Sequence, residues 1–75
     1  MDRPTQMMKQ KAGKRAVAFV RSGMVVGLGT GSTAVWAIRH LAELMARGTL
    51  TDILAIPTSE ATEREARRLK IPLIT

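Results

Sequence analysis

The stretch Gly27-Leu28-Gly29-Thr30-Gly31-Ser32-Thr33 joins an apolar run at residues 24–26 to an amphipathic run at residues 34–45. This order predicts a strand, a glycine-rich turn and the N-terminus of a helix. Such a turn presents backbone N–H groups and the positive end of a helix dipole to an anion. Its glycines allow a ligand to approach closely, and its hydroxyls can donate to phosphate oxygens. The stretch therefore predicts a phosphate-binding site.

Helices are predicted on both sides of this turn. Over residues 5–21 apolar groups recur every three or four positions, which is typical of one helix face. The residues of that face are Met8, Ala12, Ala16, Phe19 and Val20. A second helix is expected over residues 32–47, with an apolar stripe of Val35, Ile38, Leu41, Ala42 and Met45. A third begins at Thr58 or Ser59 and has a thin stripe of Ala61, Ala66 and Leu69. Its glutamates lie early and its basic residues late, as the helix dipole favours.

The short apolar run at residues 24–28 is predicted as a strand buried on both faces, and the run at residues 53–56 as a second buried strand. Residues 71–75 are predicted as the start of a third strand. Strands that alternate with helices indicate a parallel sheet. The expected fold class is α/β, a Rossmann-like three-layer fold represented here by its first three strands and three helices. Three short parallel strands leave exposed edges. We therefore expect residues 1–75 to be the N-terminal part of a single α/β domain that is incomplete here, or to pair with another chain.

Composition limits the possible partners. The chain has 75 residues, no Cys and one His, so thiolate metal sites are excluded and no metal is expected. No apolar run is long enough to span a bilayer, and we expect a cytoplasmic protein without a membrane partner. The net charge is +6, but the basic residues are spread from Arg3 to Lys70 without interleaved aromatic residues. Nucleic acid is therefore not expected as a partner.

Other interpretations of the turn fit the sequence less well. A Walker A loop requires a Lys before its final Ser or Thr, which Gly31-Ser32-Thr33 lacks. The dinucleotide fingerprint G-x-G-x-x-G has Ser32 in place of its third glycine. The glycines could also make a tight turn with Thr30 or Ser32 as a simple helix cap. One cap needs one hydroxyl, whereas this stretch has three.

The sequence resembles type A ribose-5-phosphate isomerases over nearly its whole length. The resemblance is carried by Lys9, by residues 16–23, by residues 25–34, by Ile56-Pro57-Thr58-Ser59-Glu60-Ala61-Thr62-Glu63 and by Leu69-Lys70-Ile71-Pro72-Leu73. It implies that Thr30, Gly31, Ser32 and Thr33 bind the sugar phosphate. It further implies interconversion of ribose 5-phosphate and ribulose 5-phosphate without a cofactor. The substrate would be the small-molecule partner, and the full-length form is expected to be a homo-oligomer.

The catalytic motifs of that family are not found in these residues. Its Asp-Gly-Ala-Asp motif, Lys-Gly-Gly-Gly loop and catalytic glutamate follow the segment matched here. None of the carboxylates present, namely Asp2, Glu43, Asp52, Glu60, Glu63 and Glu65, is nominated as the catalytic base. We expect the isolated chain to be inactive. The alternatives are a non-catalytic sugar-phosphate-binding effector domain and an inactive truncated chain.

Overall fold

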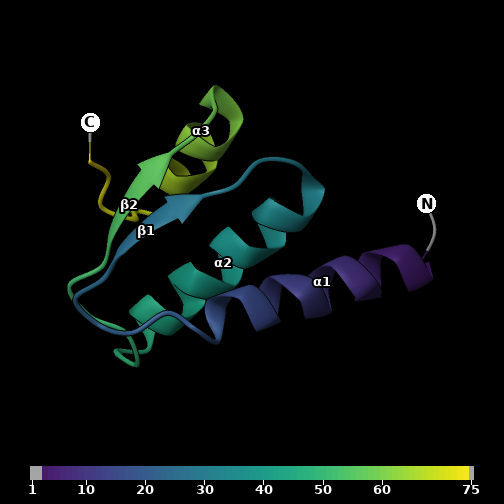
Figure 1. Cartoon of the computed structure of the whole chain (residues 1–75), viewed down its shortest axis with the longest axis horizontal. Coiled ribbons are helices and arrows are strands. Elements are labelled where there is room, and N and C mark those ends of the chain that lie inside the picture. The colour runs from purple at the N-terminus through teal and green to yellow at the C-terminus, as the bar shows by residue number, and fades with distance from the viewer. Residues whose placement is uncertain (1–2, 75) are drawn as a thin grey trace.

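The computed structural model describes residues 3–74 and has the expected alternation of helices and strands. Its elements are α1 (Arg3–Val17), β1 (Val25–Leu28), α2 (Ser32–Ala46), β2 (Leu54–Pro57) and α3 (Glu60–Arg68) (Figure 1). β1 and β2 pair in parallel, and Val26 lies opposite Ala55. The predicted α/β class is confirmed. Within residues 3–74, no helix is both long and apolar enough to cross a membrane.

The third predicted strand is reduced to one parallel bridge between Ala55 and Leu73. The N–H of Ala55 donates to the carbonyl of Pro72 at 2.9 Å, and the N–H of Ile74 donates to the carbonyl of Ala55 at 2.8 Å. Pro72 has no N–H, which limits how far this ladder can extend. Thr75, the last residue of the predicted strand, lies outside the described residues.

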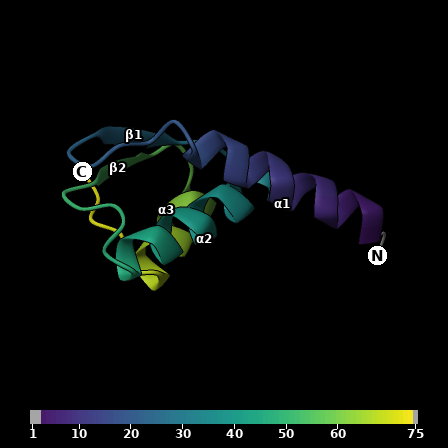
Figure 2. The same ribbon diagram turned by 90° about the horizontal axis from the view of Figure 1, so that it is seen from below.

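The core lies on one face of the sheet. α2 and α3 lie on the same side of the two strands, and α1 packs against α2 (Figure 2). Leu28 and Ala55 point into this side and are buried with Ile38, Leu41 and Ala66. On the opposite side Val25 is 55% exposed, and Leu54 and Ile56 are each 43% exposed. The prediction that both strands are buried on both faces is therefore wrong for residues 3–74. These residues form two of the three layers expected, because no helix among them covers the second face.

Helix α1 packs through a different face from the one predicted. Among its residues 7–17, Gly13 and Val17 are buried, whereas Met8 is 70% exposed. Phe19, which follows the helix, is 81% exposed. A Cβ placed on Gly13 would lie 2.7 Å from the backbone nitrogen of Ala37 and 2.9 Å from the carbonyl carbon of Trp36. The absence of a side chain at Gly13 thus lets the two helices touch, and this contact sets the rotation of α1.

The predicted helix over residues 5–21 also ends early, at Val17. Residues 22 and 23, which follow this helix, form hydrogen bonds with the loop that precedes β2. The N–H of Gly23 donates to the carbonyl of Thr51 at 3.0 Å, and the N–H of Thr51 donates to the hydroxyl of Ser22 at 2.9 Å. Just after the helix, the N–H of Val20 donates to the carbonyl of Val17 at 2.9 Å, a spacing of three residues instead of the four of an α-helix.

Helices α2 and α3 follow the predictions more closely. Ile38 and Leu41 of the predicted α2 stripe are buried. Ser59 caps α3, one of the two predicted caps, while Ala66 is buried and Ala61 is exposed.

Across the α2–α3 contact, Glu65 pairs with Arg68 of its own helix at 2.6 Å and with Arg39 at 3.1 Å. The hydrogen bond from Arg68, followed by that from Arg39, lowers the pKa of Glu65 against the opposing effect of partial burial.

Candidate functional site

The glycine-rich turn lies where β1 ends and α2 begins. Gly31 is the N-cap of α2 and has φ 91° and ψ 177°, a backbone conformation almost restricted to glycine. Thr30, Gly31, Ser32 and Thr33 are all exposed. The structure thus places the four predicted site residues together, on the surface, at the carboxyl end of a parallel strand. Ligands of open α/β sheets bind at such ends.

The start of α2 has no side-chain cap. No side-chain hydrogen bond caps this helix within the described part of the chain. Helix α3 differs, because the hydroxyl of Ser59 accepts from the N–H of Thr62 at 3.2 Å. The interpretation of Thr30 or Ser32 as a simple cap is therefore wrong. The first-turn N–H groups of α2 and the positive end of its dipole remain available to an anion.

The loop between β2 and α3 contacts the turn. The hydroxyl of Thr58 donates to the carbonyl of Leu28, at the end of β1. The hydroxyl of Thr30 donates to the hydroxyl of Ser59 at 3.3 Å. Adjacent parallel strands thus bring two loops, 29 residues apart in sequence at Thr30 and Ser59, into one hydroxyl-rich surface.

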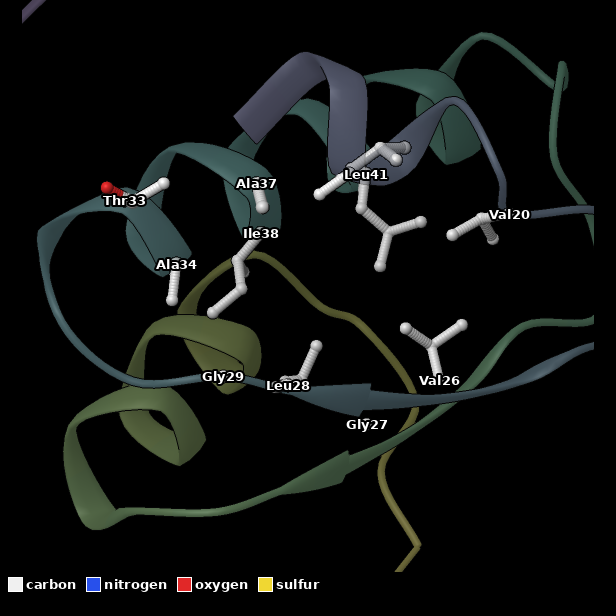
Figure 3. Close-up of a pocket in the computed structure, with 12 residues that line it drawn as sticks. Val20, Val26, Gly27, Leu28, Gly29, Thr33, Ala34, Ala37, Ile38 and Leu41 are labelled. Carbon is white, nitrogen blue, oxygen red and sulfur yellow. The ribbon is translucent and has the colours of Figure 1, made fainter. Parts of the chain in front are cut away.

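The cavity beneath the turn has the wrong chemistry for a phosphate. Its volume is about 220 Å³, and most of its lining comes from apolar side chains of α1, β1 and α2 (Figure 3). Thr33 lies at its rim, and its hydroxyl oxygen points away from the apolar centre in Figure 3. A charged phosphate in this cavity would lose its hydration without gaining partners. A phosphate bound at this turn would therefore lie on its exposed side.

Three of the five carboxylates among residues 3–74 are ion-paired with arginines. Glu43 pairs with Arg47 at 2.5 Å, Glu63 pairs with Arg67 at 2.9 Å, and Glu65 pairs with Arg39 and Arg68. Glu60 lies in the first turn of α3, where it complements the helix dipole. Asp2 lies outside the described residues. Residues 3–74 contain no group of three His, Asp or Glu side chains placed to hold a metal ion.

Sequence reasoning missed the contribution of the second loop. Thr58 and Ser59 were predicted only as possible helix caps, and their hydrogen bonds to the turn depend on the register of the two strands. The similar hydroxyl content of the two loops, each of which follows a strand, is the one local feature that hints at this contact.

The chain is similar in sequence to known ribose-5-phosphate isomerases. Ribose-5-phosphate isomerase A of Desulfatibacillum aliphaticivorans is 54% identical over 67 residues, which cover 89% of this chain and 29% of that protein. The corresponding protein of Trichodesmium erythraeum is 51% identical over 72 residues, 96% of this chain and 30% of that protein. The resemblance to ribose-5-phosphate isomerase A is confirmed. No family model matches the chain.

Solved ribose-5-phosphate isomerases share the fold. A D-ribose-5-phosphate isomerase in complex with phospho-erythronic acid superposes with a TM-score of 0.91 at 40% identity, covering 93% of this chain and 31% of that one. The enzyme from Plasmodium falciparum gives a TM-score of 0.91 at 42% identity, over 93% of this chain and 30% of that one. The chain thus spans about 30% of the length of these four isomerases.

Proposed function

We propose that residues 1–75 supply the sugar-phosphate-binding turn of a ribose-5-phosphate isomerase. The observation that carries this proposal is the uncapped N-terminus of α2 at Gly31, flanked by the exposed hydroxyls of Thr30, Ser32 and Thr33. Free N–H groups and hydroxyls suit the several oxygens of a phosphate dianion. The similarity to ribose-5-phosphate isomerases, one of which is described in complex with phospho-erythronic acid, supports the same ligand class.

The proposed reaction is the aldose–ketose interconversion of ribose 5-phosphate and ribulose 5-phosphate, a step of the pentose phosphate pathway. A carboxylate moves a proton between C1 and C2 through an enediolate, and the turn holds the phosphate end of the substrate. Three glutamates of this chain are ion-paired with arginines, and none is assigned the proton transfer. We expect no isomerase activity from the 75-residue chain alone. The proposal includes a single α/β domain of which these residues form the N-terminal part, a cytoplasmic location and self-association of the full-length form.

Calorimetric titration of the chain with ribose 5-phosphate tests the proposed ligand. Thr33→Val removes one hydroxyl from the turn and keeps the shape of the side chain. We expect it to weaken binding by about 1–3 kcal/mol, the range for a hydrogen bond to a charged group. Thr51→Val makes the same chemical change in the loop before β2 and should leave the affinity unchanged.

Two results would contradict this assignment. If both valine variants bind ribose 5-phosphate as the wild type does, Thr33 is not part of the site. If the wild-type chain is folded and binds no ribose 5-phosphate, the turn alone does not make the site. Binding without turnover in a longer protein that carries this chain would favour the effector-domain alternative.

A further inference from the structure

The β2–α3 loop holds the glycine-rich turn through two side-chain hydrogen bonds. Thr58 donates to the carbonyl of Leu28, the residue that precedes Gly29, and Thr30 within the turn donates to Ser59. Both bonds therefore join the β2–α3 loop to the β1–α2 connection. One is made at the end of β1 and the other inside the glycine-rich turn.

Ser59 is itself held in place. Its hydroxyl accepts from the N–H of Thr62 at 3.2 Å and lies 3.1 Å from the hydroxyl of Thr62. The Thr62 hydroxyl also bonds the carbonyl of Ser59 at 3.1 Å, and Thr62 is only 1% exposed. The buried Thr62 thus bonds both the hydroxyl and the carbonyl of Ser59. Ser59 is therefore a fixed hydrogen-bond partner for Thr30.

A neighbouring partner distinguishes one hydroxyl of the turn from the other two. The Thr30 hydroxyl lies 3.3 Å from the hydroxyl of Ser59 and forms a hydrogen bond with it. Ser32 and Thr33, which start α2, are the turn hydroxyls that remain free of this bond and stand beside the uncapped N–H groups.

We propose that Thr30 is a positioning residue: its bond to the Ser59 hydroxyl holds the glycine-rich turn in the arrangement that binds the phosphate. This inference rests on the proposed function, because it concerns the same site. Its physical basis is preorganisation. A turn with glycines at positions 29 and 31 loses much backbone freedom when it binds a ligand, and a bond to a fixed neighbour reduces that loss beforehand.

A double-mutant cycle tests the pair. The variants Thr30→Val, Ser59→Ala and the double variant are titrated with ribose 5-phosphate and with inorganic phosphate. Each single change should weaken binding about three- to tenfold, the value of one lost hydrogen bond. The double variant should bind no more weakly than the weaker single variant, because both changes remove the same bond.

Two further readouts separate positioning from general stability. Ser59→Ala also removes the cap of α3 and should lower the melting temperature, whereas Thr30→Val should not. Ser59→Asn keeps a side-chain oxygen that can cap the helix and accept from Thr30. It should restore both the melting temperature and most of the affinity.

The possible outcomes distinguish this inference from the function on which it rests. A wild-type chain that is folded but binds neither ligand overturns the proposed function and this inference with it. Losses that multiply in the double variant overturn the inference alone. So does a loss with Thr30→Val but none with Ser59→Ala, since Thr30 would then act without the help of Ser59.

Discussion

Gly13→Ala should destabilise the chain, although alanine is the better helix former. In an open helix this change would stabilise by up to about 1 kcal/mol. Here the new Cβ would lie 2.7 Å from the backbone nitrogen of Ala37 and 2.9 Å from the carbonyl carbon of Trp36. Backbone atoms cannot move aside as a flexible side chain can, so α1 must shift away from α2. We expect a net loss of about 2 kcal/mol, or a fall of about 10 °C in melting temperature.

Gly27→Ala is the matched control for this change. A Cβ on Gly27 meets no other atom within 4 Å, and we expect little change in the melting temperature. Hydrogen exchange of the α1 amides adds a local readout, because α1 should lose protection first in Gly13→Ala. A Gly13→Ala variant at least as stable as the wild type would show that α1 and α2 do not meet at this residue.

Gly31→Ala should strain the turn without any steric clash. The residue has φ 91° and ψ 177°, yet a Cβ built on it meets no atom within 4 Å. The cost is therefore a cost in backbone conformation, about 1–3 kcal/mol. Relief of that strain would turn the first N–H groups of α2 away from their present direction. We expect both a lower free energy of unfolding in urea and a loss of at least about tenfold in ribose 5-phosphate affinity.

Gly29→Ala is the control for Gly31→Ala. It adds the same methyl group to the turn at a residue whose φ is not positive. Gly29 does not have a positive φ, and a Cβ there would lie 3.7 Å from the Cβ of Ala34, an ordinary contact. This variant should unfold at nearly the urea concentration of the wild type. If Gly31→Ala is as stable as Gly29→Ala, the backbone conformation at Gly31 does not require glycine.

The helix predictions show where sequence periodicity succeeds and where it fails. In α2 the large residues Ile38 and Leu41 form the apolar stripe, and both are buried. The stripe predicted over residues 5–21 includes Met8 in α1 and Phe19 beyond its end, and both are exposed. The actual contact uses Gly13, which periodicity counts as neutral. A glycine inside a helical pattern is itself a sign of close packing, and it would have indicated the correct face.

The arrangement of the candidate site could be predicted only in part. Glycines and hydroxyls next to a helix start are local features, and they located the turn at Gly31 correctly. The hydrogen bond from Thr30 to Ser59 joins residues 29 positions apart, and only the pairing of β1 with β2 brings them together. Exposure of Val25 and Leu54 also follows from the arrangement of the helices, since a strand sequence does not reveal which of its faces a neighbour covers.

The most direct test of the central claim is an NMR titration of the chain with ribose 5-phosphate, with inorganic phosphate and ribose as controls. The account predicts that both phosphates shift the amides of residues 29–34 selectively and that ribose has little effect. Ser59 should shift to a smaller extent, through its bond to Thr30. A folded chain whose turn amides do not respond to either phosphate, or respond equally to ribose, would contradict the assignment of this turn as a phosphate site.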